Sequence, residues 1–236
     1  MHYSLSRNST AKTPLVAFAG LAASLGGVVT VAASLMLKTV LIPLVVLATI
    51  VAWASRGVAV DYPHRAIGMC NVVTLIRAAI VAFLAGAAFD PSASQWLFFS
   101  LAALALALDG VDGWLARRSG LASAFGARFD METDAALAAV LALALMLRGT
   151  AGAEILVLGF ARYAFVAAGL GFPALQAPLP EMFRRKLICV LQIGTLVVLS
   201  FPLTPEAVVT PLSLTAAALL IWSFVIDVLW LCRRAS

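Results

Sequence analysis

The chain has 236 residues, of which 63% are hydrophobic and only 11% are charged, and its mean hydropathy is +1.05. This composition excludes an ordinary soluble globular domain. The formal net charge of +5 comes from basic residues that stand in short groups at the ends of apolar runs. Membrane topology explains that placement, so nucleic acid is not expected as a partner.

Long apolar runs predict membrane-spanning helices, because about 20 helical residues cross the ~30 Å hydrocarbon layer. The sequence shows no alternating barrel pattern. The predicted spans are roughly 14–35, 39–55, 68–88, 95–116, 129–147, 153–171, 187–203 and 209–231. We therefore expect an all-α integral membrane protein, a helical bundle of about eight spans. The proline-containing connection 171–186 is expected to carry an interfacial helix.

The basic residues also predict the orientation of the chain. With a cytoplasmic N-terminus, twelve of the sixteen Lys and Arg residues fall on the cytoplasmic side, while only Lys38 and Arg148 fall outside. Both termini are therefore expected to face the cytoplasm from a multi-pass position in the cell membrane. Arg77 and Arg162 lie inside spans, where a charge usually faces the bundle interior or a polar cavity. The alternatives are snorkelling to the interface or pairing with a buried acid such as Asp227.

Five of the eleven acidic residues lie between Asp109 and Asp134. At about 100° per helical residue, Asp109 and Asp112 share one helix face, and Asp130 and Asp134 share a face of the next helix. Similar lengths of apolar helix separate each pair from the extracytoplasmic side. The two pairs should therefore lie at the same depth, about 10 Å beneath the cytoplasmic interface.

Four carboxylates at that depth would repel one another unless cations compensated them. Mg²⁺ and Mn²⁺ prefer oxygen ligands, and two such ions about 4 Å apart can hold a diphosphate. We therefore expect a site for two ions, Mg²⁺ or Mn²⁺, and phosphate chemistry. Small residues on these helices leave room for substrate, and a basic residue is placed to contact phosphate: Gly113, Ala116, Gly126 and Arg117.

Two other functions also fit an acidic cluster within a membrane. An intramembrane prenyltransferase uses aspartate-bound Mg²⁺, although such enzymes usually place two acidic motifs far apart in sequence. An ion-coupled transporter would use the aspartates with Arg77 and Arg162 as an ion pathway. The charges here crowd at one depth, which favours an enzyme over a pathway that crosses the membrane.

The acidic segment resembles the signature of the CDP-alcohol phosphatidyltransferase family, D-x-x-D-G-x-x-A-R-x8-G-x-x-x-D-x-x-x-D. The matching residues are Asp109, Asp112, Gly113, Ala116, Arg117, Gly126, Asp130 and Asp134. A looser resemblance covers the N-x-x-T-x-x-R helix of the family, with Asn71, Thr74 and Arg77 in the matching positions, and a later basic-to-glutamine helix at 184–192.

The resemblance implies a six-helix catalytic core at 66–236, often dimeric, preceded by an extension at 1–65 with two additional transmembrane helices. By this likeness Asp109, Asp112 and Asp130 bind metal, and Asp134 is both a ligand and the general base. The donor is a CDP-linked lipid or alcohol, the acceptor is an alcohol hydroxyl, and CMP is released. The residues that the likeness assigns to the CDP diphosphate are Asn71, Thr74, Arg77, Gly113, Ala116, Arg117 and Gly126.

At two positions the sequence differs from the pattern of relatives that use phosphorylated acceptors. Relatives that use phosphorylated acceptors often carry a basic residue directly after the last aspartate, and commonly Pro or Ser after the third; here these positions are Ala135 and Met131. Other basic residues can substitute, and the candidates for acceptor binding are Arg128, Arg162, Arg184, Arg185 and Lys186. The sequence leaves open both the acceptor alcohol and the choice between CDP-diacylglycerol and another CDP-alcohol.

Overall fold

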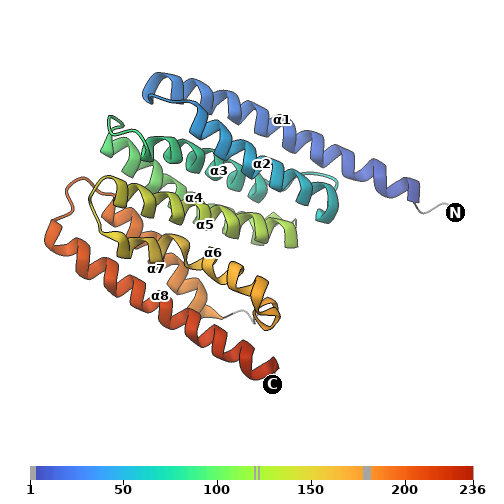
Figure 1. Cartoon of the computed structure of the whole chain (residues 1–236). Helices are drawn as coiled ribbons and strands as arrows, with labels where there is room; N and C mark the ends of the chain where they lie inside the picture. Colours follow the sequence, from blue (N-terminus) through green and yellow to red (C-terminus); the bar gives the residue numbers. More distant parts are fainter. Residues whose placement is uncertain (1–3, 120, 122, 178–181, 236) are drawn as a thin grey trace. The chain divides into compact units, whose positions relative to one another are not determined.

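The computed structural model describes the backbone of residues 4–119, 121, 123–177 and 182–235. It also describes the side chains of these residues, except those of 4–13, 112–117, 119, 174, 176 and 235. This part of the chain forms eight α-helices and two short 3-10 helices, with no strand (Figure 1). The predicted all-α class is confirmed.

The helices follow the predicted spans in order: α1 (Ser4–Met36), α2 (Leu41–Asp61), α3 (Met69–Ala88), α4 (Gln95–Ser119), α5 (Ala124–Leu147), α6 (Leu156–Gly171), α7 (Phe183–Leu199) and α8 (Glu206–Ala235). The 3-10 helices are η1 (Ala153–Ile155) and η2 (Pro173–Gln176). Among the described residues, five segments are long and apolar enough to cross a membrane: Pro14–Met36, Leu41–Asp61, Met69–Ala88, Ala153–Gly171 and Glu206–Arg234. The helices that carry the acidic cluster, α4 and α5, are not among them. The described apolar segment of α4 is the shorter Gln95–Val111, and three acidic residues, Asp130, Glu132 and Asp134, interrupt the apolar run of α5.

Some helices are longer than the predicted spans, because they continue into polar residues beyond the apolar run. The α5 helix begins at Ala124, where the pattern predicts a span from 129, because Ser123 precedes it and its Oγ accepts the Gly126 N–H at 3.0 Å. The connection 171–186 contains the 3-10 helix η2 where an interfacial helix is expected, and its residues 178–181 lie outside the described part.

The chain forms two compact units, Met1–Asp134 and Ala135–Ser236, and α5 continues from the first into the second. In the first unit, α3 buries most of its side chains and packs against α1, α2 and α4. A Cβ added at Gly86 of α3 would lie 2.7 Å from Pro43 Cδ of α2, so the absence of a side chain lets these helices approach closely. This central helix carries the polar side chains of Asn71, Thr74 and Arg77 into the interior.

The second unit uses the same close packing. A Cβ added at Gly159 of α6 would lie 2.6 Å from the Cβ of Ala142 on α5. The side-chain amide of Gln192 on α7 donates a hydrogen bond to the Leu158 carbonyl of α6, and α7 packs against α8. The division into an extension (1–65) and a catalytic core (66–236) is based on the family resemblance and not on compactness. It therefore stays a prediction.

Candidate active site

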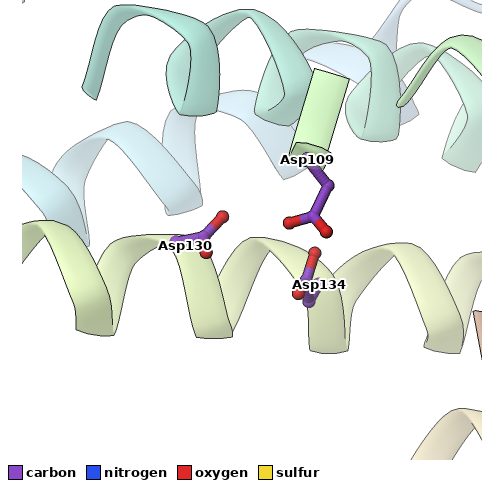
Figure 2. A group of neighbouring side chains, drawn as sticks. All are labelled: Asp109, Asp130 and Asp134. Carbon is purple, nitrogen blue, oxygen red and sulfur yellow. The ribbon is translucent and has the colours of Figure 1, made fainter. Parts of the chain in front are cut away.

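Three aspartates converge inside the first unit. Asp109 comes from α4, whereas Asp130 and Asp134 lie one turn apart on α5, and Figure 2 shows the three carboxylates pointing toward one another. One oxygen from each lies within 4.8 Å of the others. The four-residue spacing on α5 places two carboxylates on the same face, as the sequence predicts. Their side chains are 29%, 36% and 16% exposed, so a ligand can reach them.

Arg77 of α3 contacts all three carboxylates. Its side chain is 1% exposed, and its Nη1 lies 3.2 Å from Asp109 Oδ1. The same Nη1 donates to Asp130 Oδ1, and Nη2 donates to Asp134 Oδ1. Snorkelling of Arg77 to the interface is wrong, because its side chain is buried, and the acids that it contacts in the first unit are the clustered aspartates. It therefore acts here as a counter-ion within the site.

This donor set fits a divalent cation. Three carboxylates carry up to three negative charges, and Arg77 supplies one positive charge, so the described part of the cluster stays negative. Carboxylate oxygens are the ligands that Mg²⁺ and Mn²⁺ prefer. The described side chains can therefore hold a cation, while the number and identity of the ions expected from the sequence stay predictions.

A second polar feature adjoins α5. Asn71 of α3 is 1% exposed, and its Nδ2 has no hydrogen-bond partner among the described residues. A Cβ added at Gly126 would lie 2.8 Å from Asn71 Oδ1, so the glycine is needed for this close approach. A buried donor without a partner is costly, so Asn71 Nδ2 is a candidate for binding a ligand. Thr74, by contrast, donates its hydroxyl to the Cys70 carbonyl within the helix at 3.0 Å.

Several predicted site residues lie outside what the structure describes. Four of them, Asp112, Gly113, Ala116 and Arg117, lie in the stretch of α4 whose side chains the structure does not describe. Their roles in binding metal and diphosphate stay predictions.

Three of the candidate acceptor-binding residues have acidic neighbours that the sequence did not identify. Arg128 forms an ion pair with Asp61 at 2.6 Å. Arg184 of α7 lies 2.5 Å from Asp227 of α8 and donates to the Ser223 carbonyl and hydroxyl, and Arg185 Nε lies 3.9 Å from Asp227.

Arg162 and Lys186 lie on α6 and α7 of the second unit. The sequence named Asp227 as a buried acid that could pair with an arginine, but it did not identify Arg184 as its partner, and it gave no signal for Asp61 beyond the scarcity of acids, which number eleven in the chain. Acceptor binding by these basic residues stays a prediction.

A family model described as CDP-alcohol phosphatidyltransferase matches residues 67–229. Neither a curated protein nor a solved structure gives a match. The matched region covers well over half of the 236 residues and includes α3, α4 and α5, whose side chains build the aspartate cluster. The chain therefore belongs to the CDP-alcohol phosphatidyltransferase family and is a phosphotransferase of the membrane.

Proposed function

We propose that this protein is a metal-dependent enzyme that transfers a phosphatidyl group from CDP-diacylglycerol to the hydroxyl of an alcohol and releases CMP. The observation that carries the proposal is the convergence of Asp109, Asp130 and Asp134 around a single buried arginine, within the region that matches the family. An excess of negative charge among apolar helices calls for a cation. The family match favours this reaction over prenyl transfer and ion transport.

In the proposed mechanism, Asp109, Asp112, Asp130 and Asp134 hold the cations. When bound, Mg²⁺ or Mn²⁺ supplies Lewis-acid stabilisation of the diphosphate oxygens. Asn71, with its buried Nδ2, and Arg117 donate hydrogen bonds to the CDP moiety. Gly126, which has no side chain, lets Asn71 lie close against α5.

Asp134 accepts the proton of the acceptor hydroxyl as that oxygen attacks the phosphorus of the phosphatidyl group. A new bond forms between this oxygen and phosphorus, and the bond to the CMP phosphate oxygen breaks, so CMP leaves. Arg77 binds Oδ1 of Asp134, and we assign proton transfer to Oδ2 of the same carboxylate. Arg77 thus orients the base.

The surroundings of the site are also part of the proposal. The basic residues favour a site and termini that face the cytoplasm, so that a water-soluble nucleotide can leave while the acyl chains stay in lipid. A homodimer is expected from the family likeness.

The test uses purified protein in detergent with CDP-diacylglycerol, Mn²⁺ or Mg²⁺ and a panel of neutral and phosphorylated alcohols, and it measures CMP. We expect metal-dependent CMP release with at least one alcohol, and loss of that release in Asp134→Asn. Glu132→Gln is the matched control, because this acid lies on the same helix but outside the cluster. CMP release that survives in Asp134→Asn would remove the proposed base.

A further inference from the structure

The two N-terminal helices precede the matched region 67–229, yet they pack against the helix that bears two of the aspartates. One buried cluster joins side chains of four helices: Phe18 and Ala22 of α1, Ala54 and Val58 of α2, Leu75 and Ala78 of α3, and Phe125 and Phe129 of α5. Helix α5 therefore enters this core through two aromatic rings.

Rings of the N-terminal helices surround Phe129. Its ring is fully buried and lies edge-on to Phe18 of α1, with ring centroids 6.0 Å apart. Trp53 of α2 lies 6.4 Å away, and Phe125 stacks on Phe129 at 5.7 Å. Contacts on several sides limit the positions that this ring can occupy.

Helix α2 meets Phe125 through its backbone. A Cβ added at Gly57 would lie 2.6 Å from Cδ2 and 2.7 Å from Cε2 of the Phe125 ring, closer than carbon atoms can approach. The ring is itself only 2% exposed. Any side chain at Gly57 must therefore displace the Phe125 ring, which has little room to move in a packed core.

The end of α2 also contacts the first part of α5 and the residues that precede α3. Its last residue, Asp61, pairs with Arg128 of α5 at 2.6 Å. The Tyr62 hydroxyl donates to the Ala66 carbonyl and accepts the Gly68 N–H, both at 2.9 Å. Gly68 directly precedes α3, the helix of Arg77.

The aromatic rings and the aspartates occupy adjacent rows of α5. Phe125 and Phe129 form one row, and Asp130 and Asp134 form another that starts one residue, or about 100°, further round the helix. A rotation of α5 that moves the rings must therefore also turn both aspartates away from Asp109.

We propose that α1 and α2 are a positioning element for the metal site, because their contact with Phe125 and Phe129 fixes the rotation of α5 and thereby sets the affinity of the aspartate cluster for a divalent cation. The inference rests on the metal-binding part of the proposed function. It gives the N-terminal helices a role in the site, although none of their residues belongs to the aspartate cluster.

The test measures Mn²⁺ binding to the purified full chain by electron paramagnetic resonance, together with the unfolding temperature. Gly57→Leu is compared with Gly20→Leu, a matched control on α1 where an added Cβ meets nothing within 4 Å. We expect Gly57→Leu to raise the Kd for Mn²⁺ about 10–100-fold, as changes that misplace metal ligands do, and Gly20→Leu to leave it unchanged.

A double variant covers the case in which Gly57→Leu does not fold. Combining Gly57→Leu with Phe125→Ala removes the ring that the new side chain meets. We expect this protein to fold and to bind Mn²⁺ more tightly than Phe125→Ala alone, because the leucine fills the vacated space.

Unchanged Mn²⁺ affinity in folded Gly57→Leu would overturn the inference, as would a double variant that binds no better than Phe125→Ala. Wild-type protein that binds Mn²⁺ but releases no CMP would overturn the proposed reaction alone. Wild-type protein that binds no Mn²⁺ would overturn both.

Discussion

Among the side chains that the structure describes, each compact unit holds a cluster of arginine and aspartate between its apolar helices. In the first, Arg77 of α3 contacts aspartates of α4 and α5. In the second, Arg184 of α7 contacts Asp227 and Ser223 of α8. Both clusters bury charged groups among apolar helices, where an ion needs partners to offset its lost hydration.

The clusters differ in their balance of charge. The first joins three carboxylates to one guanidinium, whereas Asp227 has Arg184 at 2.5 Å and Arg185 at 3.9 Å. Ionised, the described groups sum to about −2 in the first and about +1 in the second. The first therefore attracts a further cation, while the second already satisfies its acid and joins α7 to α8. A buried ion pair alone does not indicate a metal site, whereas an excess of carboxylates is compatible with one.

The largest expected effect separates the two clusters by activity. Asp130→Asn should lower CMP release by more than the ~10–100-fold typical of residues that only orient a metal ligand. It should leave the metal-free protein at least as stable as the wild type, because one repelling charge is gone. Asp227→Asn should show the reverse pattern, with near-normal turnover per folded molecule. Turnover and unfolding temperature are measured on both variants. Equal losses of turnover would contradict the assignment of the first cluster to activity and the second to stability.

The next effect concerns the arginines. Arg77→Met leaves three carboxylates without their buried counter-ion, so the metal-free protein should lose about 3–5 kcal/mol of stability. A cation at 100 times its Kd stabilises a protein by about 2.7 kcal/mol, and the gain should be larger in Arg77→Met, because the cluster is more negative. Arg184→Met should also be less stable than the wild type, but Mn²⁺ should stabilise this variant no more than it stabilises the wild type. Denaturant unfolding with and without Mn²⁺ tests this, and an equal metal gain in all three proteins would contradict it.

A smaller effect concerns Asp227. Asp227→Asn removes the charge that Arg184 and Arg185 share, and a buried polar group that loses its partner costs about 1–3 kcal/mol. Ser223→Ala, which removes only a neutral acceptor from Arg184, should cost less. Unfolding measured at equal detergent concentration gives the order of the two variants. A greater loss in Ser223→Ala would mean that the hydroxyl, and not the charge, holds α7 to α8.

The sequence predicted those features that depend on the chain's local period. Apolar runs of membrane length predicted eight helices, and the helical repeat placed Asp130 and Asp134 on one face; both agree with the structure. The lengths of apolar helix beside the two acidic pairs also predicted that carboxylates of α4 and α5 would lie at the same depth. The shared face of Asp130 and Asp134 follows from helix geometry alone, whereas the approach of Asp109 also depends on how α4 and α5 are arranged.

Partners between distant helices could not be predicted in the same way. Arg77 is 53 residues from Asp130, and Arg128 is 67 residues from Asp61. Such pairs depend on how each helix is rotated and which helix lies beside it, and small residues such as Gly57 and Gly86 determine that packing through contacts that are not visible in sequence. The family likeness assigned Arg77 to the CDP diphosphate, which stays a prediction, and its contact with these three aspartates was not predicted.

The smallest effect concerns Asp90, a carboxylate held mainly by neutral donors, which separates hydrogen bonding from the charge balance of the two clusters. The Ser92 hydroxyl at 2.6 Å and the Lys38 and Ser92 N–H groups at 2.7 and 2.9 Å hold the pKa of Asp90 below its ordinary value. Because the pKa is lowered in the folded chain, the stabilisation is present above the unfolded value of about 3.9 and is lost as pH falls through the folded value. Ser92→Ala should therefore lower the unfolding temperature at pH 5–7, by an amount that shrinks in more acidic solution, and it should leave the gain from Mn²⁺ unchanged. A difference from wild type that grows below about pH 4 would reverse the sign of this linkage and show that Ser92 stabilises the protonated acid.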